Sequence, residues 1–558
     1  MIPALSITRA RCVRGLRKLA LAATACALAP AAALAQPVVN APAGPVRGEA
    51  LDGVNVFRGL PYALPPTGWR RWRPPAEMPA WRQTRDATQF GAACHQPVSR
   101  GESIYAGEAP TMSEDCLFLN VWAPKDARNA PVFVWIHGGA LTTGASSEAM
   151  YDGARLAAEQ GLVVVSINYR LGVLGYLAHP ELSAESRRNI SGNYGLQDQI
   201  AALEWIKANI GAFGGDAGQV TIAGESAGAL SVMYLMAAPQ ARGLFHRAIA
   251  QSAYMISTPE LRSRRHGDPP AEMVGVWLQS QLGRQNLAEL RAMDAQDLVV
   301  QSLTKGYSPW GAVDGEYLPE QLVEVFDRGR QAPVPLLAGF NQGEIRSLRI
   351  LLPPNPPTDA AVYEQTIREK YGELADAFLR LYPSSNLKEA YLATQRDGLY
   401  GWTAERLMQR QARTGQPGYL YFFDHGYPAA DNADLHAFHA AEIPYVFGAA
   451  DRTPPRWPAI PDTPVEHDLS AAMRSYWGSF ARTGVPSATG GPDWPAYGEA
   501  RAYMAFEDTP VARERLMPGM FETQETLVCR RRAAGGVPWN WNFGVLSPPL
   551  SPRTPACP

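Results

Sequence analysis

Residues 224–228 read Gly-Glu-Ser-Ala-Gly, a spacing that can hold a serine as a nucleophile. The four residues before them, 220–223, form a short apolar run with β-branched side chains, which is typical of a buried strand. The residues that follow, 227–236, are small and compatible with a helix. A Gly-x-Ser-x-Gly turn between a strand and a helix lifts the serine hydroxyl above the sheet, because only glycine fits on either side of so tight a bend. Ser226 is therefore the candidate nucleophile.

A serine nucleophile needs N–H donors for the negative charge that develops on the attacked oxygen. The predicted strand at residues 132–136 runs into His-Gly-Gly-Ala at 137–140, where small residues leave backbone N–H groups uncovered. Together with the N–H of Ala227, the residue after the nucleophile, this turn could form an oxyanion hole. Taken by itself, the Gly-rich turn could equally be structural.

The nucleophile also needs a base, and an acid that orients the base. The predicted strand at residues 334–339 leads into Phe-Asn-Gln-Gly-Glu, which places Glu344 just past a strand end as the candidate acid. In the chain order Ser–acid–His, the base must follow Glu344. Four histidines do so: His425, His436, His439 and His467.

Residues 436–442, which contain two of these histidines and a glutamate, could instead bind a metal ion. They lack the His-Glu-x-x-His pattern of zinc peptidases, however, and no third ligand is indicated. The pattern alone does not separate His436 from His439 as the base.

Six short apolar runs are predicted to be strands buried on both faces, because continuous rather than alternating hydrophobicity suits a sheet covered on both sides. Between them, apolar residues recur at helical spacing, as in residues 196–210. This alternation predicts an α/β fold with a mostly parallel central sheet and helices on both faces. In such sheets, functional residues gather beyond the carboxyl ends of the strands. The predicted strands lie at residues 132–136, 162–168, 220–223, 248–251, 334–339 and 419–423.

The composition is that of a globular protein: 46% of the 558 residues are hydrophobic and 19% are charged. No linker, charge block or internal repeat divides the chain, so one large domain is predicted at residues 36–558. Residues 1–35 are predicted to be a signal peptide cleaved after Ala35, because five basic residues precede an apolar run that ends Ala-Leu-Ala. A membrane anchor is the alternative, but the run is short, Ala-rich and broken by Pro30. We therefore expect a periplasmic or secreted protein with no stable membrane insertion after cleavage.

Charge and cysteine content agree with export. Without the five basic residues of the leader, 46 of the 51 Lys and Arg remain against 53 Asp and Glu, and this acidic balance argues against nucleic acid as a partner. An even number of cysteines in an exported protein favours disulfides, whereas a thiolate metal site lacks any Cys-x-x-Cys pair here. The cysteines that follow the leader are Cys94, Cys116, Cys529 and Cys557.

Eight motifs follow one another over essentially the whole mature chain. They read FRGLPYA at 57–63, SEDCLFLN at 113–120, WIHGG at 135–139, NYRLG at 168–172, GNYGLQDQ at 192–199, FGGD at 213–216, GESAG at 224–228 and HAAEIPYVFG at 439–448. In this order they resemble the type-B carboxylesterase family, the carboxylesterase/cholinesterase branch of the α/β-hydrolases, and so many motifs in one order make a specific match.

The resemblance implies an α/β-hydrolase fold whose long loop and helix excursions form an active-site gorge. It also implies serine-dependent hydrolysis of a small-molecule carboxylic ester through an acyl-enzyme intermediate, with no metal and no organic cofactor. A Cys94–Cys116 disulfide and an ion pair between Arg71 and Glu114 are implied as well. The site residues that the resemblance implies are the triad Ser226, Glu344 and His439, and the oxyanion donors Gly139, Ala140 and Ala227.

Two departures limit what the resemblance carries over. Ala140 stands where many relatives have a third glycine, which leaves the N–H in place but narrows the approach for the acyl group. Residues 95–115 lack the tryptophan that stacks on choline in cholinesterases and contain Tyr105 instead, so a choline-ester specialist is not expected. The alternatives are an amidase or polyester-type hydrolase with the same triad, and a catalytically silent binding or adhesion homologue. The natural ester and the oligomeric state are not predicted.

Overall fold

The computed structural model describes residues 36–98 and 103–557, so the predicted signal peptide at 1–35 lies outside the described residues. Within these ranges, eleven strands form one sheet in the order β14-β13-β12-β11-β10-β9-β7-β8-β6-β4-β3. Three further strands, β1 (Val38–Ala41), β2 (Gly44–Arg47) and β5 (Arg85–Asp86), form a small separate sheet. The strands of the large sheet are β3 (Glu49–Leu51), β4 (Val54–Pro61), β6 (Phe118–Pro124), β7 (Ala130–Ile136), β8 (Val163–Ile167), β9 (Gly215–Glu225), β10 (Arg247–Gln251), β11 (Leu336–Asn341), β12 (Gly418–Phe423), β13 (Ala502–Phe506) and β14 (Pro510–Glu514).

The large sheet is parallel in its centre and antiparallel at both edges. All neighbouring strands from β8 to β13 pair in parallel. Strands β6, β4 and β3 at one edge and β14 at the other pair antiparallel. The predicted mostly parallel α/β sheet is therefore confirmed, and each of the six predicted runs overlaps one strand of its parallel part. Strands β3, β4 and β14 escaped prediction because they lack long, uninterrupted apolar runs, and β6 and β13 were missed although most of their residues are apolar and buried.

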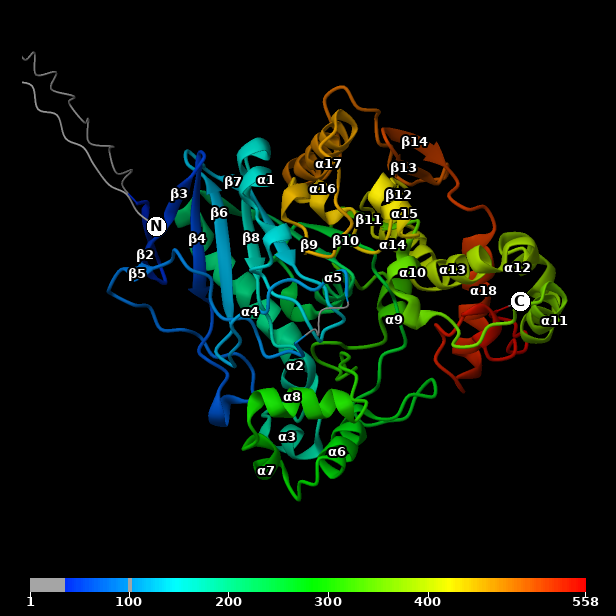
Figure 1. Ribbon diagram of the computed structural model, residues 1–558. Coiled ribbons are helices and arrows are strands. Elements are labelled where there is room, and N and C mark those ends of the chain that lie inside the picture. The colour runs from blue at the N-terminus through cyan, green and yellow to red at the C-terminus, as the bar shows by residue number, and fades with distance from the viewer. Residues whose placement is uncertain (1–35, 99–102, 558) are drawn as a thin grey trace, which may run out of the picture. The chain divides into compact units, whose positions relative to one another are not determined.

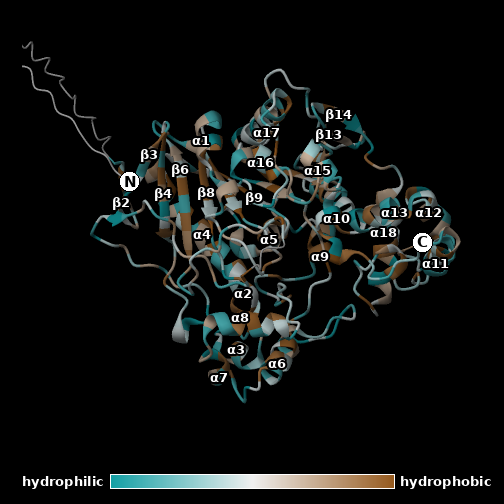
Figure 2. Ribbon diagram, in the orientation of Figure 1, coloured by the Kyte–Doolittle hydropathy of each residue, from teal (hydrophilic) through white to brown (hydrophobic). Residues whose placement is uncertain are grey.

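Helices cover both faces of the sheet (Figure 1). Strand β7 shows why its apolar run is continuous, because alternate side chains enter two different cores. Val132, Val134 and Ile136 pack in the core beneath α4, α5 and α14, whereas Phe133 and Trp135 pack beneath α1, α16 and α17. Hydrophobic residues run along β4, β6 and β8 in the same way (Figure 2). The covering helices are α4 (Tyr194–Asn209), α5 (Ala227–Ala237) and α14 (Trp402–Ala412) on one face, and α1 (Ala154–Gln160), α16 (Ile443–Phe447) and α17 (Pro464–Thr483) on the other.

The other helices belong to long excursions from the sheet, and two groups of them have hydrophobic cores of their own. One group comprises α2 (Gly172–Tyr176), α3 (Pro180–Glu185), α6 (Ala271–Gln281), α7 (Leu287–Arg291) and α8 (Ala295–Thr304), and lies at the bottom of Figure 1. The second comprises α11 (Ala360–Tyr371), α12 (Ala375–Leu381), α13 (Leu387–Arg396) and α18 (Met520–Ala534). Shorter helices are α9 (Leu322–Asp327), α10 (Glu344–Ser347) and α15 (Pro428–Asn432).

Two disulfides join Cys94 to Cys116 and Cys529 to Cys557. Such bonds persist in oxidising compartments, so they indicate that the protein matures in one. No helix in the described ranges is long and apolar enough to cross a membrane.

Candidate active site

Ser226 lies between the end of β9 and the start of α5, as the Gly-x-Ser-x-Gly motif predicts. Its backbone has φ 56° and ψ −120°, a conformation that L-residues adopt only under strain and that is frequent at functional sites. Gly228 must be glycine, because a Cβ there would clash with the carbonyl oxygen of Ile136 on the neighbouring strand β7. The turn at residues 224–228, here called the serine elbow, is held to β10 by a 2.9 Å hydrogen bond from the Ser226 N–H to the carbonyl of Gln251.

The Gly-rich turn after β7 packs directly against this elbow. A Cβ on Gly138 would lie 3.3 Å from the Cβ of Ser226. Gly139 has φ 101° and its carbonyl accepts from the N–H groups of Thr142 and Thr143, each at 2.9 Å, which closes the turn. Within residues 36–98 and 103–557, the N–H groups of Gly139 and Ala140 have no hydrogen-bond acceptor. The turn therefore brings uncovered backbone donors beside Ser226.

A third donor comes from the elbow itself. Ala227 is the first residue of α5, so its N–H has no partner within the helix. Behind the turn, the imidazole of His137 stacks on Tyr169 with ring centroids 4.6 Å apart, and its Nδ1 lies 2.9 Å from the Gly138 carbonyl. Burial lowers the pKa of His137 to about 4, so this ring is neutral and serves to hold the turn.

Glu344 is the first residue of α10, directly after β11, and its side chain is fully buried. One carboxylate oxygen accepts from the Ser252 hydroxyl at 2.6 Å and from the Asn341 N–H at 2.8 Å. The other oxygen pairs with Nδ1 of His439. The two donors fix the orientation of the Glu344 carboxylate, which in turn can orient the imidazole.

Of the four candidate histidines, the structure brings His439 to Glu344. The imidazole of His439 also faces Tyr400, with ring centroids 5.4 Å apart. The other three pair with carboxylates elsewhere: His425 with Asp508 and Glu466, His436 with Asp424 and Asp431, and His467 with Asp462.

The free edge of His439 faces the elbow. Its Nε2 lies 3.0 Å from Oε1 of Glu225, the residue before Ser226, although this contact lacks hydrogen-bond geometry. In the described part of the chain, the hydroxyl of Ser226 makes no hydrogen bond to His439. Burial lowers the pKa of His439, but the carboxylates of Glu225 and Glu344 outweigh it and raise the pKa to about 9. Burial raises the pKa of Glu225 to about 8.

A third buried carboxylate, Glu442, supports the segment that carries His439. Its oxygens accept from the side-chain amides of Gln251 at 2.9 Å and Asn341 at 2.6 Å. The same Asn341 amide donates to the carbonyl of Phe438 at 2.8 Å, which fixes the peptide before His439. These residues were not predicted, although Gln251 and Asn341 end strands β10 and β11 and the strand-end rule points to such positions.

In residues 36–98 and 103–557, no group of three or more His, Cys, Asp or Glu side chains is arranged to hold a metal ion. The site instead places a serine on a strained turn, a carboxylate–imidazole pair and uncovered backbone N–H groups at one edge of the sheet. This set of groups suits nucleophilic acyl transfer.

Comparison with known proteins gives the same chemistry. The Carboxylesterase family matches residues 35–523. The para-nitrobenzyl esterase of Bacillus subtilis is 34% identical over 86% of this chain and 96% of its own, and the fumonisin B1 esterase of Sphingopyxis macrogoltabida is 35% identical over 82% and 84%. A solved PNB esterase structure superposes with a TM-score of 0.75 at 33% identity, covering 88% of this chain and 99% of that one.

The structural match includes the mostly parallel sheet, so the chain has the α/β-hydrolase fold. The sequence matches extend over nearly the full length of both proteins at more than 30% identity. We conclude that this chain belongs to the carboxylesterase family and is a serine-dependent hydrolase of carboxylic esters.

Proposed function

We propose that Ser226, His439 and Glu344 form the catalytic triad. The observation that carries this proposal is the buried pair between Glu344 and His439 Nδ1, which lies at the same strand ends as the serine elbow. A carboxylate on Nδ1 fixes the tautomer whose Nε2 can accept a proton. The contact from Nε2 to the Ser226 hydroxyl is expected to form when substrate binds, since such hydrogen bonds often tighten only in the complex.

The proposed reaction has two steps. In the first, His439 takes the Ser226 proton as the hydroxyl attacks the ester carbonyl, and the alcohol leaves with that proton. In the second, His439 activates a water molecule that attacks the acyl-enzyme, and the acid is released. In both steps, the N–H groups of Gly139, Ala140 and Ala227 would hold the oxyanion, and each such donor typically contributes about 3–4 kcal/mol to transition-state stabilisation.

The electrostatics of the site support a base that works on the alkaline side of neutrality. Imidazolium forms while the Ser226 proton is transferred, and the carboxylates of Glu344 and Glu225 stabilise it. The same carboxylates raise the pKa of His439, so the neutral base becomes available only as the pH rises. We therefore expect kcat/KM to fall on the acid side of the histidine titration.

The proposed substrate is a small-molecule carboxylic ester. Relatives that resemble this chain are named for different esters, para-nitrobenzyl, fumonisin B1 and cocaine among them, so the family accommodates varied acyl and alcohol groups. A series of p-nitrophenyl esters from acetate to long-chain acids would measure the acyl preference, and a matched p-nitroanilide would separate an esterase from an amidase.

The triad itself is tested by labelling and substitution. An organophosphate should inactivate the enzyme with one phosphoryl adduct on the Ser226 peptide, identified by mass spectrometry. Ser226→Ala should fold with an unchanged thermal transition and lose roughly 10⁴-fold or more in kcat. Turnover close to wild type in Ser226→Ala would refute the proposed nucleophile.

We further propose that the chain is exported to the periplasm or beyond and that residues 36–558 form one domain. The motif pattern of residues 1–35 and the two disulfides support export. The large sheet takes strands from Glu49 to Glu514, which supports one domain. N-terminal sequencing of the mature protein should begin at Gln36, and a start at Met1 would contradict cleavage.

A further inference from the structure

Tyr105 makes a contact with the candidate catalytic histidine that the proposed triad does not explain. Its hydroxyl lies 2.9 Å from the carbonyl oxygen of His439 and 2.7 Å from the hydroxyl of Ser347. A carbonyl can only accept, so Tyr105 donates to His439, and the same hydroxyl lies within hydrogen-bond distance of the Ser347 hydroxyl. Burial raises the pKa of Tyr105, so the phenol stays protonated at any working pH.

The bond acts on a strained part of the chain. Ala440, directly after His439, has φ 68°, a left-handed conformation that is unfavourable for any residue with a Cβ. The carbonyl of His439 belongs to the peptide that this φ orients, so the Tyr105 hydroxyl holds the strained conformation in place. Asn341 holds the preceding peptide through the Phe438 carbonyl at 2.8 Å. Both peptide groups that flank His439 are therefore fixed by side chains from other segments.

Tyr105 also connects the histidine to its acid. Ser347 is the last residue of α10, the short helix that begins with Glu344. Through the two hydroxyls, the carbonyl of His439 is tied to the same helix whose first residue contacts its imidazole. The ring of Tyr105 packs edge-on against Trp457 at 5.8 Å, and Trp457 in turn packs on Phe438 at 4.7 Å.

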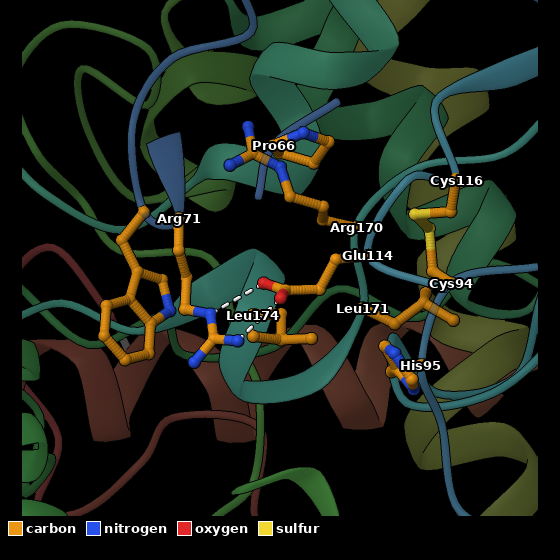
Figure 3. Close-up of a pocket in the computed structure, with 10 residues that line it drawn as sticks. Pro66, Arg71, Cys94, His95, Glu114, Cys116, Arg170, Leu171 and Leu174 are labelled. Carbon is orange, nitrogen blue, oxygen red and sulfur yellow. Dashed lines mark hydrogen bonds and ion pairs between the residues drawn. A yellow bond between two sulfur atoms is a disulfide. The ribbon is translucent and has the colours of Figure 1, made fainter. Parts of the chain in front are cut away.

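The loop that delivers Tyr105 is anchored at both of its ends. The two cysteines of the Cys94–Cys116 disulfide are 22 residues apart, and Tyr105 lies midway between them. Near Cys116, Glu114 accepts two hydrogen bonds of 2.6 Å from Arg71, and the two side chains face each other beside the disulfide (Figure 3). This is the ion pair that the family resemblance implies.

The other end, near Cys94, is hydrogen-bonded to the chain just after the Gly-rich turn at residues 137–140. The side chain of Gln96 exchanges two hydrogen bonds with the backbone of Gly144, of 2.9 and 3.0 Å. Side-chain hydrogen bonds therefore hold the chain at Gln96 and at Glu114, on either side of Tyr105.

We propose that Tyr105 is a positioning residue for His439: by joining the His439 carbonyl to Ser347, it keeps the imidazole aligned with Glu344 for proton transfer. This inference rests on the proposed triad. Tyr105 acts on the backbone of the base, and its hydroxyl touches none of the reacting atoms.

Tyr105→Phe tests the proposal because it removes the hydroxyl and keeps the ring on Trp457. We expect kcat on p-nitrophenyl acetate to fall about 5- to 20-fold, the loss of one buried hydrogen bond in the transition state, with KM within twofold. Tyr363→Phe is the matched control, since that hydroxyl also donates to a backbone carbonyl at 2.9 Å and that ring also packs edge-on, at 5.6 Å against Tyr391. The control should keep wild-type kcat.

The pH profile of kcat/KM separates alignment from a general loss of structure. The carboxylates that face His439 are Glu225, Glu344 and Glu442. A less well aligned imidazole pairs more weakly with Glu344, so the acid limb of Tyr105→Phe should move to lower pH. The limb of Tyr363→Phe should not move.

Ser347→Ala provides a second variant that leaves the Tyr105 side chain whole. It should reduce kcat less than Tyr105→Phe and should have no further effect in the double variant, because Ser347 acts through Tyr105. Additive losses would overturn the proposal, as would wild-type kcat and pH profile in Tyr105→Phe or Ser347→Ala. A raised KM with unchanged kcat would also overturn it, by placing the hydroxyl on substrate.

These outcomes are distinct from failure of the triad. If wild-type enzyme acquires the phosphoryl adduct on Ser226 and Ser226→Ala is inactive, wild-type behaviour of Tyr105→Phe refutes only the positioning role. An active Ser226→Ala would refute the triad and this inference together.

Discussion

Two clusters of carboxylates in this molecule differ in the groups that bind them: one has mostly neutral hydrogen-bond donors, and the other has arginines. The active-site cluster, Glu225, Glu344 and Glu442, is buried and is bound by neutral donors and one histidine. The arginine cluster lies between α9, α14 and α18, where Asp327 and Glu525 face three arginines. Those arginines are Arg406, Arg410 and Arg532.

The partners decide what each cluster can do. Burial would raise the pKa of Asp327, but Arg406 and its neighbours outweigh it and lower that pKa, so Asp327 keeps its charge to lower pH than an exposed aspartate. In the active site, burial raises the pKa of Glu225 to about 8, and no arginine is among the groups that shift it. The active-site cluster therefore contains groups that titrate near the working pH, whereas the arginine cluster joins helices α9, α14 and α18.

The largest expected effect is on catalysis, from Glu344→Gln. The amide removes the charge that stabilises the imidazolium and can hold His439 in the wrong tautomer, so kcat/KM should fall roughly 10³- to 10⁴-fold with folding intact. Steady-state kinetics and a thermal melt would measure this. Asp327→Asn, the matched change in the arginine cluster, should leave kcat/KM of the folded enzyme near wild type. A loss of less than tenfold in kcat/KM for Glu344→Gln would contradict the view that the active-site cluster serves catalysis and the arginine cluster serves stability.

Arg406→Met should show the reverse pattern. The guanidinium is fully buried and contacts both Asp327 and Glu525, so its loss leaves two carboxylates underpaired. We expect the free energy of unfolding to fall by about 3 kcal/mol, measured by denaturant titration, with kcat/KM unchanged. Arg368→Met, which breaks an exposed pair with Asp376, is the control and should cost less than about 1 kcal/mol. Equal destabilisation by the two variants would contradict a special role for the buried cluster.

Glu225→Gln should move the pH profile. The Glu225 carboxylate favours the charged form of His439 and so raises its pKa. Without that charge, the imidazolium loses its proton more readily, and the neutral base exists at lower pH. The acid limb of kcat/KM against pH should therefore shift to lower pH, measured on a p-nitrophenyl ester corrected for nitrophenol ionisation. An acid limb that stays in place or moves to higher pH would show that Glu225 does not set the titration of the base.

The smallest effect is expected from Glu442→Gln. Hydrogen bonds connect Glu442 to His439 through Asn341 and the Phe438 carbonyl, and an amide can still accept some of the hydrogen bonds that the carboxylate accepts. A reduction in kcat of about fivefold, the net value of one hydrogen bond, should accompany an unchanged KM. A loss as large as that of Glu344→Gln would place Glu442 in direct contact with the chemistry.

Much of the fold was predictable because its signals are local. A strand in a parallel sheet is covered on both faces, so its side chains are apolar without interruption, and six such runs mark the centre of the sheet. The edge strands β3, β4 and β14 carry weaker patterns because one side of each lacks the same cover. Predicted bounds differed by a few residues, as for β9, which begins at Gly215 and not at 220.

The candidate site was predictable only in part. The serine elbow is recognisable because five neighbouring residues satisfy one steric demand, namely a turn in which a Cβ at Gly228 would strike the next strand. The base could not be recognised from local sequence in the same way, because two histidines, His436 and His439, lie only three positions apart. The pattern left them equivalent, and the family resemblance indicated His439.

The sequence by itself determined six strands of the parallel part of the sheet, the place of the nucleophile and the family motifs, because each depends on residues close together in the chain. The tertiary structure alone decided that Glu225 and Glu442 also lie near His439, and how the surrounding carboxylates shift its pKa. It also decided that Tyr105 reaches the His439 carbonyl, 334 residues further along the chain. Burial and charge–charge distances arise only when remote segments pack together, and these set proton affinities in the site.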